Sequence, residues 1–214
     1  MSALETAEQA PSRGRIDKQQ AVLAAAFAVF ARGGYAQARV DDIAAEAQVA
    51  KATVYNHFHD KESLFRQAVQ SLSRTALAAN LAAIEKLASA DGDLTTRLTE
   101  VGRHLIECYC TEESRTLRRL VCAEATQFPD LVDLVTEVSR RATSALADRL
   151  ARLSLAGELE IDDPELAAAQ FAALLAGPAD SLLRLGTSQP SDTELRAVTD
   201  AAVRTFLKAF GPGR

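Results

Sequence analysis

The sequence is poor in cysteine and in aromatic residues. Among its 214 residues are three cysteines, one methionine and no tryptophan, and aromatic residues make up 5%. Three thiols do not provide the disulfide framework of a small secreted protein, and a chain of this length buries a core without disulfides or a structural metal. We therefore expect Cys108, Cys110 and Cys122 to be thiols of a protein from a reducing compartment.

Long apolar runs are also missing. The longest, residues 21–31, has 11 residues, whereas a membrane-spanning helix needs about 20. The opening segment Met1–Glu5 has neither the basic nor the apolar region of a secretory signal. We therefore expect a cytoplasmic protein with no membrane partner.

The sequence lacks the residue patterns that mark common active sites. It has no nucleophile beside a base, no paired carboxylates and no glycine-rich phosphate loop at diagnostic spacing. We therefore expect no enzyme activity and no cofactor. His57 and His59 have no third ligand nearby, so we also expect no bound metal. His104 and Cys108 share one face of a predicted helix, where they are typical of a helical core. A helical enzyme built on this pair stays an alternative, as does a redox sensor that uses Cys108 with Cys122.

Charge is distributed unevenly along the chain. The net charge is −5, but residues 13–61 contain seven basic and five acidic residues, a balance of +2. Residues 62–214 contain 17 basic and 22 acidic residues, a balance of −5. This asymmetry indicates that contacts with nucleic acid belong to about the first 60 residues.

The pattern of apolar residues predicts an all-α protein. Alanine, leucine and arginine dominate, apolar residues recur at spacings of three and four, and β-branched runs are short. We expect about nine helices, at residues 17–32, 40–47, 51–57, 61–88, 94–109, 114–127, 130–152, 164–185 and 192–210. Residues 1–12 are polar and are expected to be disordered.

Two of these helices have distinctive ends or faces. Gly33 and Gly34 can adopt the left-handed conformation that ends the first helix. The helix at 164–185 is apolar around most of its circumference, so it needs burial on more than one side. A subunit interface is the simplest way to provide that burial.

Residues 40–58 have the pattern of a helix, a three-residue turn and a second helix. Apolar residues on matching faces would pack the two helices together, namely Val40, Ile43, Ala44, Ala47, Val49, Val54 and Phe58. This arrangement is a helix-turn-helix, whose second helix enters the major groove of DNA. The polar residues of that second helix, expected to face bases and phosphates, are Lys51, Thr53, Tyr55, Asn56 and His57.

The same region resembles the DNA-binding domain of TetR-type repressors, over residues 16–66. The matching residues are Phe30, Gly34, Tyr35, Val40, Ile43, Ala44, Ala47, Val49, Thr53, Tyr55, His57, Phe58, Lys61, Glu62 and Leu64. A second, shorter segment, residues 120–131, resembles efflux-pump regulators of this family.

Three positions depart from the family's pattern. The family usually has a capping Ser or Thr near Arg39, Gly at Gln48 and a capping Ser at Ala50. A lost cap costs about 1 kcal/mol, and a residue other than glycine at positive φ costs a similar amount. Arg39 is expected to contact a phosphate instead.

The resemblance implies a homodimer that binds a pseudo-palindromic operator in double-stranded DNA and releases it when a small hydrophobic effector binds. The implied domains are a DNA-binding domain at 13–60 and a ligand-binding and dimerisation domain at 61–214. The helices near 164–185 and 192–210 would form the dimer interface. A dimer that binds DNA without responding to any effector is the alternative.

The resemblance also implies roles for individual residues. The implied DNA contacts are Lys51, Thr53, Tyr55, Asn56, His57 and Lys61, with Arg13 and Arg15 forming an arm that reaches the minor groove. Arg39 is added to these contacts for its charge, not from the resemblance. Our candidates for contacts with the effector are His104, Cys108, Tyr109, Phe128 and Phe171. We expect no catalytic residues and no metal-binding residues in this chain.

Overall fold

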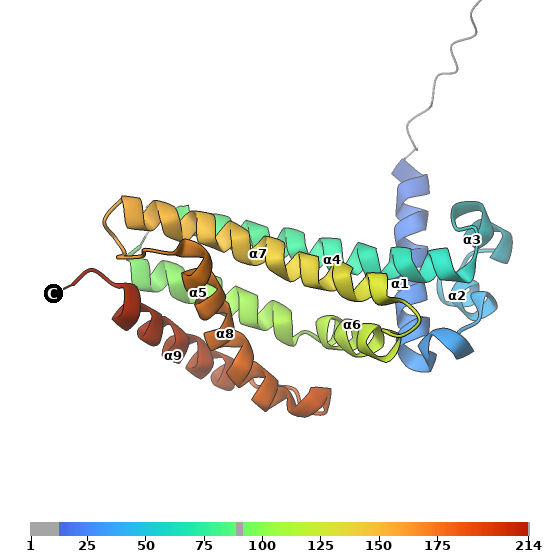
Figure 1. The fold of residues 1–214 in the computed structure, drawn as a ribbon. Coiled ribbons are helices and arrows are strands. Elements are labelled where there is room, and N and C mark those ends of the chain that lie inside the picture. The colour runs from blue at the N-terminus through green and yellow to red at the C-terminus, as the bar shows by residue number, and fades with distance from the viewer. Residues whose placement is uncertain (1–12, 89–91, 214) are drawn as a thin grey trace, which may run out of the picture. The chain divides into compact units, whose positions relative to one another are not determined.

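The computed structural model describes residues 13–88 and 92–213, and within these ranges it is helical apart from turns and loops. Across these ranges lie nine α-helices, labelled in Figure 1, and two 3-10 helices: α1 (Arg13–Gln37), α2 (Val40–Glu46), α3 (Lys51–His57), α4 (Lys61–Glu85), η1 (Lys86–Ala88), α5 (Leu94–Cys110), α6 (Glu112–Ala123), α7 (Pro129–Leu155), α8 (Pro164–Leu183), η2 (Arg184–Gly186) and α9 (Asp192–Phe210). The predicted all-α fold is confirmed. The tail predicted at residues 1–12 lies outside the described residues.

Two helices differ most from their expected limits. α1 begins at Arg13 rather than at residue 17, and it ends at Gln37 rather than at residue 32. Gly34, with a φ of 70°, interrupts the helical backbone within it. α6 begins at Glu112, because the Thr111 hydroxyl accepts a hydrogen bond from the Ser114 N–H at 3.2 Å. It ends four residues earlier than expected, since residues 124–127 form a turn before Pro129.

Side-chain caps fix the starts of several helices. Asp93, Asp163 and Ser191 accept hydrogen bonds from the backbone N–H groups three residues ahead. Ser191 and Glu194 form a reciprocal capping box at the start of α9. α8 and α9 begin at Pro164 and Asp192, the residues at which the sequence predicts these helices to start.

The chain divides into two compact units between Ser71 and Leu72, within α4. The first unit has an aromatic core formed by α1 and the start of α4. The Phe30 and Phe65 rings meet edge to face with centroids 4.8 Å apart, and the Tyr35 ring lies 5.2 Å from Phe65. α2 packs between α1 and α3 through buried Ile43 and Ala44. This packing holds the short helices α2 and α3, which are too short to be stable alone.

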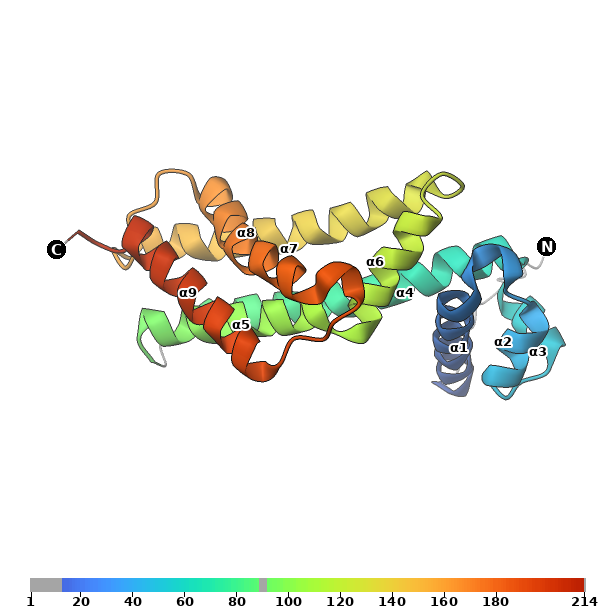
Figure 2. The ribbon, with the colours of Figure 1, turned by 90° about the horizontal axis from the view of Figure 1, so that it is seen from below.

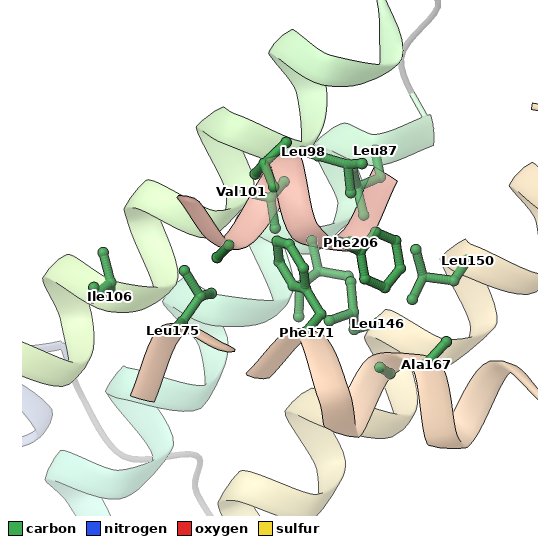
Figure 3. Packing of buried hydrophobic residues seen from close by; sticks show 14 of the residues in the cluster. Leu87, Leu98, Val101, Ile106, Leu146, Leu150, Ala167, Phe171, Leu175 and Phe206 are labelled. Carbon is green, nitrogen blue, oxygen red and sulfur yellow. The ribbon is translucent and has the colours of Figure 1, made fainter. Parts of the chain in front are cut away.

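The second unit has its core where α5, α7, α8 and α9 meet. α8 packs against α5, α7 and α9 (Figure 2), and the Phe171 and Phe206 rings lie edge to face at its centre, 5.1 Å apart (Figure 3). Arg97 of α5 is also buried, where it donates a hydrogen bond to the Leu87 carbonyl at 2.9 Å and pairs with Glu158. The core is therefore mostly apolar, and at its end the buried Arg97 pairs with the partly exposed Glu158.

The stretch Pro164–Gly186, α8 with η2, is long and apolar enough to cross a membrane by length and composition alone. We missed this stretch in the sequence because we considered only uninterrupted apolar runs. In the fold its inner residues Ala167, Phe171 and Ala179 are fully buried against neighbouring helices. The chain itself thus buries one side of this helix, while Leu166 stays 54% exposed.

Candidate functional site

The backbone of the helix-turn-helix holds without side-chain caps. Arg39 and Ala50 stand at the N-cap positions of α2 and α3 with extended φ and ψ, and neither side chain makes a capping hydrogen bond. Gln48, in the turn between the helices, has a φ of 54°. All three departures from the family's pattern therefore carry the local costs expected from the sequence.

α3 presents one polar face to solvent. Val54 and Phe58 are 1% exposed and anchor the helix in the core. Lys51, Tyr55 and Asn56 are exposed, whereas Thr53 and His57 are half-buried at the edge of the same surface. Tyr55 is 45% exposed, which is unusual for a large aromatic side chain and is typical of a binding surface.

Ion pairs arrange the cations around this face. The Lys51 ammonium lies 2.8 Å from Asp41, and this hydrogen bond raises the pKa of Lys51 and lowers that of the Asp41 carboxyl. The Arg39 guanidinium lies 3.9 Å from the same carboxylate and its side chain is 74% exposed. Both cations are therefore held at the start of α2 and α3, where a phosphate would compete with Asp41.

Lys61 has a structural contact that the sequence did not reveal. Its ammonium donates a hydrogen bond to the Ala36 carbonyl at 3.1 Å and lies 4.6 Å from the centroid of the Tyr35 ring. These contacts tie the start of α4 to the end of α1. The side chains of Arg13 and Arg15 lie outside the described part of the structure.

A cavity of about 140 Å³ opens between four helices of the second unit. We call it the effector cavity because Tyr109, one of the residues that the sequence predicts to contact an effector, lies on its wall. It is lined by Asn80 and Ile84 of α4, Leu105, Ile106 and Tyr109 of α5, Ser139, Ala142, Thr143 and Leu146 of α7, and Ala172, Leu175 and Ala176 of α8. The lining contains no charged residue among these twelve. Most of it is apolar, so the cavity suits a neutral, predominantly apolar molecule.

Two polar groups of this lining are distinctive. The Asn80 Oδ1 is buried and has no hydrogen-bond partner within the described part of the chain. The Tyr109 hydroxyl donates to Asp180 at 2.7 Å, the Arg118 guanidinium lies 3.8 Å from its ring centroid, and burial raises the pKa of Tyr109 to about 12. Tyr109 therefore stays a neutral donor at physiological pH, whereas Asn80 offers an unused acceptor.

The other candidate residues are dispersed. Phe171 lies in the core, and Phe128 is buried just before α7. His104 and Cys108 do not belong to the cavity's lining. Burial raises the pKa of the Cys108 thiol, which disfavours the reactive thiolate. Of the five candidates, the fold places only Tyr109 on the cavity wall.

Sequence reasoning missed the polar residues of the effector cavity. Asn80 lies three residues after buried Leu77 and four before buried Ile84, so it shares their inward face of α4. Thr143 and Ser139 likewise precede Leu146 along α7. A polar residue within an otherwise apolar helix face was the signal that could have identified them.

Comparison with known proteins supports one family over both units. Residues 22–68 match the family described as bacterial regulatory proteins of the tetR family, and residues 96–212 match the C-terminal domain of AefR-like transcriptional repressors. The chain belongs to the TetR family. Its members are transcriptional regulators that bind DNA operators and small-molecule effectors and form homodimers.

Individual relatives agree with this assignment over nearly the full length. A TetR-family regulator from Mesorhizobium loti has 31% identity and a TM-score of 0.84, over 94% of this chain and all of its own. The flavonoid-responsive regulator FrrA has 28% identity and a TM-score of 0.66, over 92% of this chain and 99% of its own. The regulator AcrR of Shigella flexneri is 24% identical over 91% of this chain and 89% of its own length.

Proposed function

We propose that this TetR-family protein is a repressor that binds a pseudo-palindromic operator as a homodimer and releases it when a small, mostly apolar effector enters the effector cavity. The observation that carries the proposal is the buried, unpartnered Asn80 Oδ1 in that cavity. An unsatisfied buried acceptor costs about 1–3 kcal/mol. A ligand with a hydroxyl or N–H group offsets this cost, so the effector combines an apolar body with a hydrogen-bond donor.

The size of the cavity supports a switching role. Its volume of about 140 Å³ is below the roughly 300–1,000 Å³ of typical ligand pockets. An effector of drug size therefore has to displace α4, α5, α7 or α8 as it enters. Such a ligand favours a different arrangement of these helices, which is the condition for shifting a conformational equilibrium.

The polar face of α3 supports operator binding. Tyr55 and Asn56 are exposed, and with the half-buried Thr53 and His57 they would contact bases or phosphates. Lys51 and Arg39 would supply positive charge to the DNA backbone. Lys61 uses one N–H on the Ala36 carbonyl, which leaves donors of its ammonium for a phosphate. Arg13 and Arg15 remain candidates for the minor groove.

The outer face of α8 and α9 supports dimerisation. A mostly apolar groove of about 440 Å³ runs between these helices and is lined by Gln170, Ala173, Leu174, Pro178, Thr205, Phe206, Ala209 and Phe210. A second copy of the chain would bury this surface. Two recognition helices per dimer then read the two halves of a pseudo-palindrome.

Fluorescence anisotropy tests the operator part of this proposal. The full-length protein is titrated against the DNA upstream of its own coding region and against a scrambled duplex, at two salt concentrations. We expect specific binding that Tyr55→Ala weakens by about tenfold or more, the range for a lost base contact. Lys51→Ala should weaken binding and flatten its salt dependence. Lys86→Ala removes the same charge from η1 and should change neither.

The same assay tests the effector. Neutral aromatic compounds with hydroxyl groups, including a flavonoid, are added to the protein–operator complex. We expect one or more to release DNA from the wild-type protein, and Asn80→Leu to need a concentration about tenfold higher. Release that is unaffected by Asn80→Leu would refute the role of Asn80. Equal binding to both duplexes would indicate that the protein is attracted only to DNA phosphates. If no compound released the DNA, the protein would be one that binds DNA without responding to an effector.

A further inference from the structure

A second cavity of the C-terminal unit is lined by arginines, and we call it the arginine cavity. Its volume is about 340 Å³, and its walls are Arg115, Arg118 and Arg119 of α6, Asp180 and Leu183 of α8, and Leu185 and Gly186 of η2. Arg118 and Arg119 follow Arg115 by three and four residues, so each lies beside Arg115 on the surface of α6. These arginines belong neither to the proposed operator contacts nor to the lining of the effector cavity.

The charges on this lining do not balance. Asp180 is the only acidic group among its seven residues, and it accepts the hydrogen bond of the Tyr109 hydroxyl at 2.7 Å. Three guanidinium groups therefore face one carboxylate that is already engaged. Their mutual repulsion is unfavourable unless a further negative charge lies between them.

The geometry of each arginine leaves donors available. Arg115 donates to the Ser188 carbonyl at 2.9 Å, but its Nε is buried with no partner among the described residues. Arg119 donates to the Thr116 hydroxyl at 3.1 Å through one of its nitrogens. Arg118 lies over the Tyr109 ring, 3.8 Å from the centroid, which fixes the plane of its guanidinium group. The cavity thus holds pre-oriented donors with unused hydrogen-bonding capacity.

We propose that the arginine cavity binds a small anion through a carboxylate or phosphate group. The planar guanidinium fork matches the two oxygens of either group, and such charge-assisted hydrogen bonds are about twice as strong as neutral ones. Leu183 and Gly186 form part of the cavity's wall beside the arginines. The site is distinct from the effector cavity, whose lining carries no charge.

Calorimetric titration of the full-length protein tests this site, with inorganic phosphate and succinate as probes at constant ionic strength set by chloride. Both probes are too polar for the effector cavity. We expect saturable binding of at least one probe, and the tighter of the two identifies the preferred group. Arg118→Gln and Arg119→Gln should each weaken binding by about tenfold or more. Arg115 is left unchanged because its bonds to the Gly186 and Ser188 carbonyls hold η2 and the segment after it against α6.

Two controls separate this site from general attraction. Arg140→Gln removes the same charge from an exposed arginine of α7 that pairs with Glu137, and it should leave binding unchanged. The chain has three tyrosines and no tryptophan, so a change in tyrosine fluorescence on anion binding reports on the ring beneath Arg118. That change should disappear in Tyr109→Phe while the calorimetric binding persists.

Several outcomes would overturn the proposal. The wild-type protein could show no saturable binding of either probe, or Arg140→Gln could weaken binding as much as Arg118→Gln does. A shift of the monomer–dimer equilibrium by Arg119→Gln, without anion binding, would assign the arginines to contacts with a second copy. A loss of DNA affinity without anion binding would assign them to nucleic acid.

Discussion

At the scale of single residues, Gln48 is under local strain in the DNA-binding unit. Its φ is 54°, a left-handed conformation that costs a residue with a side chain about 1–2 kcal/mol. The turn holds it there, because the Gln48 N–H donates to the Ala45 carbonyl at 3.1 Å and the Val49 N–H to the Ala44 carbonyl at 3.0 Å. Packing of α2 on α3 evidently outweighs this local cost.

Gln48→Gly should therefore raise the free energy of unfolding by about 0.5–1 kcal/mol. Glycine removes the strain, although the greater freedom of the unfolded chain offsets about 0.4–1 kcal/mol of the gain. Urea unfolding followed by circular dichroism measures the change. Gln67→Gly, within α4, should lower stability by about 1 kcal/mol. If both variants lose stability alike, the turn is not strained.

At the scale of elements, α5 lies unusually close to α8 and α9. A Cβ added to Gly102 would lie 3.2 Å from the Thr199 Cγ2 and 3.3 Å from the Phe171 Cζ. Thr199 is 1% exposed and Phe171 fully buried, so neither neighbour has room to move. Glycine at this position is what allows the two helices to pack on α5.

Gly102→Ala should lower the free energy of unfolding by about 1–2 kcal/mol. Overpacking costs about 1–3 kcal/mol, and the better helix propensity of alanine returns up to about 1 kcal/mol. Thermal and urea unfolding measure the loss. In Gly33→Ala the nearest atom to the new Cβ is 3.8 Å away, so this variant should be neutral or slightly more stable. A stabilised Gly102→Ala would mean that α8 and α9 shift freely.

At the scale of the whole molecule, the apolar groove between α8 and α9 is the surface that a second copy would cover. Ala209 lines this groove and is exposed in the single chain. An arginine there disturbs no contact within the chain, but in a dimer it would place a long charged side chain in a closed apolar interface.

Ala209→Arg should therefore convert a dimer to a monomer with unchanged helix content, and it should weaken operator binding because two half-sites are no longer read together. Light scattering coupled to size exclusion gives the mass. Ala82→Arg, at an exposed position of α4, is the matched control and should stay dimeric. A dimer that survives Ala209→Arg would place the interface elsewhere.

Local features of this protein followed from the sequence alone. Helical periodicity, the starts of α8 and α9 and the register of the helix-turn-helix each depend on residues within a few positions of one another. The positive φ of Gln48 was implied by the resemblance, because the family usually has glycine at this position. The family assignment rests on the same short-range pattern, which comparison with known proteins extends over both units.

Only the tertiary structure decided which side chains meet across the fold. The Lys61 ammonium donates a hydrogen bond to the Ala36 carbonyl, 25 residues away in the sequence. The Tyr109 hydroxyl donates one to the Asp180 carboxylate, 71 residues away. Asn80 is an unpartnered acceptor because four helices enclose it, and three arginines of α6 line a cavity because residues of α8 and η2 form the rest of its wall. Periodicity identifies the buried face of a helix, but helix packing determines whether a residue on that face fills the core, as Phe171 does, or lines a cavity, as Tyr109 does.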